Sequence, residues 1–91
     1  MDFNKLSAAA EAAIDQLNQY AERYGEEGFL KAIRLQMEFI VENASSGVDP
    51  VSKLGDRTFT YAVMASRELA SPEEVLIADR LNQVTRILSE R

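Results

Sequence analysis

Apolar side chains in residues 29–44 fall on two neighbouring stripes when the stretch is drawn as a helix, at about 100° per residue. The broad stripe holds Phe29, Leu30, Ile33, Met37, Ile40, Val41 and Ala44, and the second stripe holds Ala32, Leu35 and Phe39. A surface helix needs only one such stripe, so two stripes indicate a helix with neighbours on more than one side. This pattern predicts a central helix around which the others pack.

Residues 3–24 carry a single apolar seam, whose members recur at spacings of three and four. They are Phe3, Leu6, Ala10, Ala13, Leu17, Tyr20 and Tyr24. Such a seam is typical of a helix in a bundle or coiled coil. It packs either inside its own chain, which we expect, or against a second copy. The short connection at 25–28 makes the first two helices antiparallel neighbours, and Gly25 suits the position just past a helix end.

The third helical region carries an internal break near Gly55. Asp49 and Pro50 favour a helix start, as N-cap and first helical residue, and predict a short turn at about 50–54. Gly55 and Asp56 then end that turn, so the main helix of this region is expected at about 57–70. Its inward side chains are expected to be Phe59, Ala62, Ala65, Ser66 and Leu69.

The segment 71–74 gives the clearest local signal for a helix start. Ser71 is the N-cap, Pro72 the first helical residue and Glu74 the partner in a capping box. The last helix should run to about Ser89, with an inward stripe of Ile77, Leu81, Val84 and Leu88. No segment alternates as a strand does. We therefore predict one all-α domain over residues 1–91, a compact antiparallel bundle of four main helices with the third region broken near Gly55.

The residue types that the chain lacks narrow its chemistry. It has no cysteine and no histidine, so it lacks disulfides, thiol nucleophiles and the commonest general base and metal ligand. We expect a protein that is not an enzyme and that holds no metal or cofactor. The sequence also shows no secretory signal pattern and no apolar run of about 20 residues. We therefore expect a soluble, cytoplasmic protein that makes no membrane contact.

The net charge of −5 is concentrated in the first part of the chain. Residues 1–28 hold six acidic and two basic residues and so carry −4 of it, a balance that argues against direct binding to nucleic-acid phosphates. Glu11, Asp15 and Glu22 fall within about 40° of one another on the first helix, nearly opposite its apolar seam, and Glu26 extends the line. This stripe is either a solvated face that keeps the protein soluble or a docking surface for a basic partner.

Apolar residues also exceed the single stripe that each helix of a small bundle needs. The candidates for a self-interface are Leu35, Phe39, Val63 and Met64, and the last helix adds Val75, Leu76 and Ile87. Either irregular packing accommodates these side chains, or some of them form an interface, for example in a homodimer.

These features favour a small acidic binding protein that acts by occupying a partner's surface. An inhibitor, an immunity or antitoxin-like protein, or an adaptor would all fit, and the partner would be a protein with a basic surface. The alternative is a structural homo-oligomer whose surplus apolar residues form its self-interface, without a separate partner. An enzyme that uses carboxylates or arginine alone fits the sequence least well.

Overall fold

The computed structural model describes residues 1–26 and 28–90, and these residues form helices and loops without a strand. The elements are α1 (Phe3–Tyr24), α2 (Gly28–Ser45), α3 (Pro50–Leu54), α4 (Tyr61–Glu68), the 3₁₀ turn η1 (Pro72–Glu74) and α5 (Val75–Ser89). The predicted all-α class is confirmed, with four main helices, α1, α2, α4 and α5, packed together.

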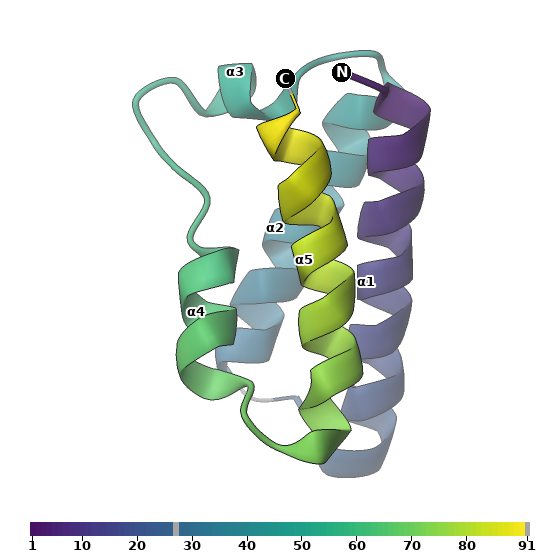
Figure 1. The fold of residues 1–91 in the computed structure, drawn as a ribbon, viewed down its shortest axis with the longest axis vertical. Coiled ribbons are helices and arrows are strands. Elements are labelled where there is room, and N and C mark those ends of the chain that lie inside the picture. The colour runs from purple at the N-terminus through teal and green to yellow at the C-terminus, as the bar shows by residue number, and fades with distance from the viewer. Residues whose placement is uncertain (27, 91) are drawn as a thin grey trace.

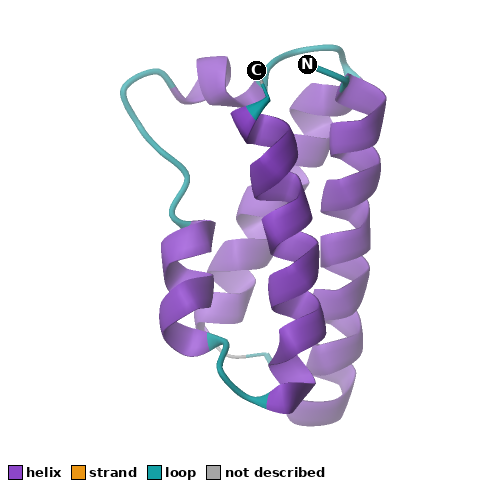
Figure 2. Cartoon of the chain, viewed as in Figure 1, coloured by secondary structure: helices purple, strands orange, loops and turns teal. Residues whose placement is uncertain are grey.

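The four main helices run alternately down and up, so that neighbours in space are antiparallel (Figure 1). α1 packs against α2 and α5, and α4 packs against the same two helices. α1 and α4 therefore occupy opposite corners of the bundle. Both termini lie at one end, beside α3, and the longest loop joins α3 to α4 (Figure 2).

The core is built from one face of each main helix. α1 contributes Leu6, Ala9, Ala10, Ala13 and Leu17, α2 contributes Leu30, Ile33, Met37, Ile40 and Ala44, and α5 contributes Ile77, Leu81, Val84 and Ile87. The alanines of α1 let its backbone approach both of its neighbours closely, because their side chains are short. In the last turn of α5 the buried residue is Ile87, whereas Leu88, which we predicted to face inward, is half-buried.

The broad stripe of α2 lies in the core as predicted, but its second stripe is only partly covered. Ala32 and Phe39 are half-buried, and Leu35 is 54% exposed. α2 has α1, α3 and α4 as neighbours but lies diagonally across the bundle from α5, so the prediction that all the other helices pack around it is wrong. α1 also has large neighbours on two sides, because α2 and α5 both pack along it.

The predicted boundaries of the third helical region are right for its short turn and wrong for its main helix. α3 spans Pro50–Leu54, and the Asp49 carboxylate accepts the Val51 N–H at 2.9 Å. Gly55, at φ 64°, ends it in a conformation that side chains disfavour. The main helix spans Tyr61–Glu68 rather than about 57–70.

α4 begins at Tyr61 because a glutamine from another helix caps it there. The side-chain oxygen of Gln36, on α2, accepts the N–H groups of Thr60 and Tyr61 at 3.0 and 2.9 Å. The Gln36 amide nitrogen donates to the Thr60 hydroxyl at 2.8 Å. Gln36 thus accepts hydrogen bonds from the backbone N–H groups at the start of α4, as the side chain of an N-cap residue usually does.

The inward face of α4 also differs from the prediction. Tyr61 and Ala65 are buried, while Ala62 and Ser66, which we expected to face inward, are exposed. The Tyr61 hydroxyl lies 2.9 Å from the Thr85 hydroxyl, whose own proton goes to the Leu81 carbonyl, so Tyr61 is the donor. This contact with α5 fixes the rotation of α4 about its axis. Burial raises the pKa of the Tyr61 hydroxyl.

Candidate functional site

The acidic candidates lie on the outer face of α1, which we call the acidic face (Glu11, Asp15, Glu22 and Glu26). All four side chains are exposed. Glu26 differs from the others, because it forms an ion pair with Arg34 of α2 at 2.7 Å. Among the described residues, Glu11, Asp15 and Glu22 have no such partner.

The neighbouring helix α2 adds carboxylates beside the acidic face. The Ser7 and Ser45 hydroxyls lie 3.2 Å apart, which shows the antiparallel register of α1 and α2. In that register Glu38 of α2 lies at about the same height along the bundle as Ile14 of α1, which is between the heights of Glu11 and Asp15. Glu38 is exposed, as is Glu42 one turn further along α2. The negative surface therefore extends from α1 onto α2.

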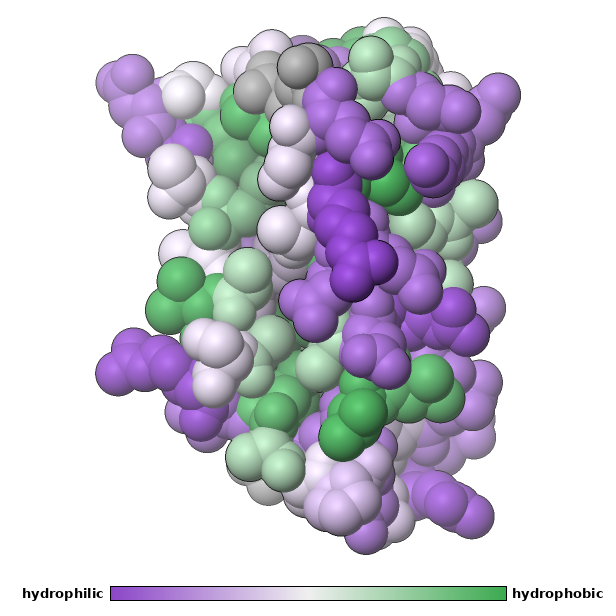
Figure 3. All heavy atoms as spheres, viewed as in Figure 1, coloured by the Kyte–Doolittle hydropathy of each residue, from purple (hydrophilic) through white to green (hydrophobic). Residues whose placement is uncertain are grey.

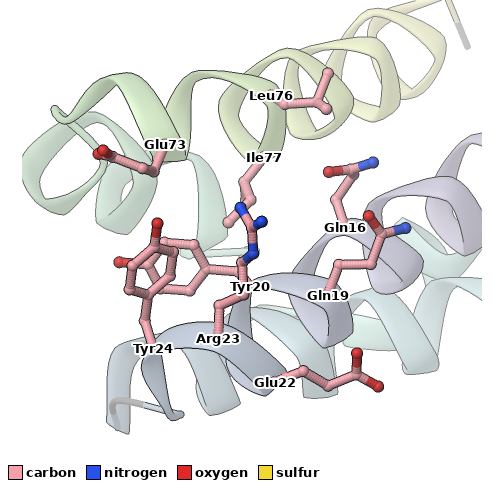
Figure 4. A pocket seen from close by; sticks show the side chains of 9 residues that line it. All are labelled: Gln16, Gln19, Tyr20, Glu22, Arg23, Tyr24, Glu73, Leu76 and Ile77. Carbon is pink, nitrogen blue, oxygen red and sulfur yellow. The ribbon is translucent and has the colours of Figure 1, made fainter.

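A hollow of about 510 Å³ lies at the C-terminal end of α1, where the helix meets η1 and the start of α5 (Figure 4). It is lined by Gln16, Gln19, Tyr20, Glu22, Arg23, Tyr24, Glu73, Leu76 and Ile77. Arg23 extends from α1 toward α5, and Glu22 points away at the edge (Figure 4). The Tyr20 and Tyr24 rings lie 4.7 Å apart and form one side. Sequence reasoning placed both tyrosines in the core seam, yet Tyr24 is 54% exposed and Tyr20 half-buried.

A buried carboxylate holds this end of the molecule together. Glu74 is 8% exposed, and its side chain accepts the Ser71 hydroxyl at 2.6 Å and the Ser71 N–H at 3.0 Å. Burial alone would raise the Glu74 pKa, but hydrogen bonds from Ser71, the Ala70 backbone and the Tyr20 side chain outweigh it and lower the pKa. The predicted capping box is confirmed. Its link to Tyr20 of α1 is an addition that sequence reasoning missed.

The self-interface candidates all lie on the side formed by α2 and α4, but they differ in exposure. Leu35 and Val63 are 54% and 57% exposed, whereas Phe39 and Met64 are half-buried against the core cluster. The Phe39 ring lies 6.0 Å from the Phe59 ring, edge to face. Leu35 and Val63 are thus the members of this set that solvent reaches most freely.

A further apolar group lies at the start of α5. Val75 is 53% exposed and Leu76 is 46% exposed. Figure 3 shows apolar side chains over α4 and over the lower end of α5, separated by a polar band that runs down the middle of the view. Exposed apolar residues are therefore present in two separate places rather than in one continuous patch.

The described residues contain no group of three or more acidic side chains placed to hold a metal ion. Within the same part of the chain, no helix combines the length and the apolar character needed to cross a bilayer. Comparison with protein families, with curated proteins and with solved structures finds no match to this chain. Its function is therefore inferred from its own residues.

Proposed function

We propose that this chain is a small helical binding protein that docks on a basic surface of another protein through the acidic face of α1. One observation carries the proposal: Glu11, Asp15 and Glu22 are exposed on the longest helix and have no ion-pair partner among the described residues. A solvated face that only confers solubility needs no such clustering.

Fixed carboxylates on a rigid helix suit a protein that works by covering a partner. The negative charges raise the rate of encounter with a partner and favour a partner of positive charge. Because the helix that carries them is already ordered, binding costs little backbone conformational entropy. An inhibitor, an immunity or antitoxin-like protein, and an adaptor all require no more chemistry than this. The absence of histidine and cysteine from the sequence favours this class over a catalyst.

The test begins with affinity purification of the partner and continues with association kinetics. The triple variant Glu11→Lys, Asp15→Lys, Glu22→Lys should lower the association rate by about tenfold or more, and raised salt should slow the wild type toward it. The matched control reverses three exposed acids elsewhere, Asp56→Lys, Asp79→Lys and Glu90→Lys. It makes the same change in net charge and should retain more of the wild-type rate. Equal rates for the two variants would show that net charge alone matters and would refute docking through α1.

A further inference from the structure

We propose that the side formed by α2 and α4 is a self-interface, on which a second copy of this chain docks about a two-fold axis near Leu35. α4 has 8 residues against 22 in α1, so it extends about 12 Å against about 33 Å along the bundle, at 1.5 Å per residue. α4 therefore leaves part of α2 uncovered. At the level where α4 begins, Leu35 is 54% exposed, and one turn further along α2 Phe39 is half-buried against Phe59 of the α3–α4 loop.

Two adjoining hollows mark this side as apolar over both helices. One, of about 440 Å³, is lined by Leu35, Gln36, Phe39, Leu54, Arg57, Thr58, Phe59 and Thr60. The other, of about 300 Å³, is lined by Phe29, Thr60, Val63, Met64, Arg67 and Glu68. Thr60 lines both, so the two hollows are neighbours, with Leu35 at the first and Val63 at the second. An exposed apolar surface with a polar rim is typical of protein–protein contact.

The charges that flank Leu35 on α2 favour a second copy as the occupant. Lys31, Leu35 and Glu38 are exposed along α2 in that order, with the two charged residues one helical turn before and after the leucine. If two copies of α2 cross antiparallel at Leu35, Lys31 of each copy lies opposite Glu38 of the other. A contact about a two-fold axis needs such a self-complementary surface. If one residue of the first copy contacts a second residue of the other copy, the same two residues also meet with the copies exchanged. The rim carries both signs elsewhere too, because Arg57 lines the first hollow and Arg67 and Glu68 line the second.

This dimer would leave the acidic faces free. α1 and α4 occupy opposite corners of the bundle (Figure 1), so a copy docked on the α2–α4 side does not cover the outer face of α1. Two acidic faces on one particle would bind a partner with repeated basic sites more tightly than one face does. This last consequence rests on the proposed function, whereas the dimer itself does not.

Sedimentation velocity on the purified chain, over about 1–100 μM, tests the dimer without any partner. The wild type should sediment as a dimer whose population rises with concentration. Leu35→Glu and Val63→Glu should each give a folded monomer, because both side chains are more than half exposed in the single chain and a carboxylate is costly in an apolar interface. The matched control is Val75→Glu, at 53% exposure on α5, which should leave the dimer intact.

A charge swap tests the position of the axis. Lys31→Glu and Glu38→Lys should each weaken dimerisation, since like charges then face one another across the axis, and the double variant should restore it. A wild type that stays monomeric to the highest concentration would overturn the self-interface. Dissociation by Val75→Glu but not by Leu35→Glu would overturn it as well, and single swaps without rescue would overturn the axis at Leu35. None of these outcomes depends on the partner of the acidic face.

Discussion

Gln36 illustrates how much a single polar side chain decides in this bundle. It makes three hydrogen bonds to Thr60 and Tyr61, across 24 and 25 positions of sequence. It thereby sets the start of α4 and the depth to which Tyr61 enters the core. Nothing in the local sequence around Gln36 distinguishes it from the exposed glutamines Gln19 and Gln83, because its partners become neighbours only when the chain has folded.

Gln36→Ala should destabilise the fold by about 1–2 kcal/mol, since two backbone donors at the start of α4 lose their acceptor. The measurement is urea unfolding together with amide hydrogen exchange. Exchange should accelerate most at Met64 and its neighbours in α4, and little in α1. Gln83→Ala, at an exposed position on α5, is the control and should shift stability by less than about 0.5 kcal/mol. Unchanged exchange in α4 would mean that the helix start does not depend on Gln36.

At the scale of the elements, the predictions that held were those carried by signals within one turn of the chain. The start of α3 at Pro50 follows from Asp49, and the break before the last helix follows from Ser71 and Glu74. The buried face of α1 follows from the spacing of its seam. Each of these depends on residues no more than four positions apart, and such residues come together whenever a helix forms.

The predictions that failed concern contacts between distant segments. The start of α4 depends on Gln36 from α2, and the rotation of α4 depends on a hydroxyl pair between Tyr61 and Thr85. The sequence identified the acids of α1 as an exposed stripe, which the structure places at the surface. It could not show that Arg34 pairs with Glu26, or that Tyr20 binds Glu74.

The junction between η1 and α5 gives a prediction for the elements that it joins. Ser71→Ala removes a hydrogen bond to the buried Glu74 carboxylate and should cost about 0.5–2 kcal/mol, whereas Ser46→Ala, in an exposed turn, should cost less. Thermal or urea unfolding measures both. Equal costs at the two serines would contradict the structural role of the capping box.

The same junction makes stability depend on pH. The folded-state pKa of Glu74 is lowered from its usual value of 4.5, so its ionised form stabilises the fold above that pH. This stabilisation should be lost as the pH falls below 4.5 and through the folded-state pKa. The difference in unfolding free energy between the wild type and Glu74→Gln should therefore shrink with acidification.

At the scale of the whole molecule, charge and apolar surface are separated onto different sides. The outer face of α1 carries exposed carboxylates, with more beside it on α2, while the α2–α4 side carries Leu35 and Val63 between charges of both signs. Because α1 and α4 lie at opposite corners, one molecule can use both surfaces at once. A homodimer and a complex with a basic partner are therefore compatible rather than competing interpretations.

Anion-exchange chromatography tests this separation of charge without a partner. Glu11→Gln, Asp15→Asn, Glu22→Gln and the control Asp56→Asn, Asp79→Asn, Glu90→Gln each remove three negative charges, which changes the net charge from −5 to −2. An anion-exchange resin binds a protein mainly through its most negative face, because the electrostatic potential at that face is the sum of the contributions of neighbouring charges. The α1 variant should elute at lower salt than the control, although the two have the same net charge. Elution of both at the same salt would mean that the acids of α1 do not act as a unit, and a basic partner would then have no reason to select that face.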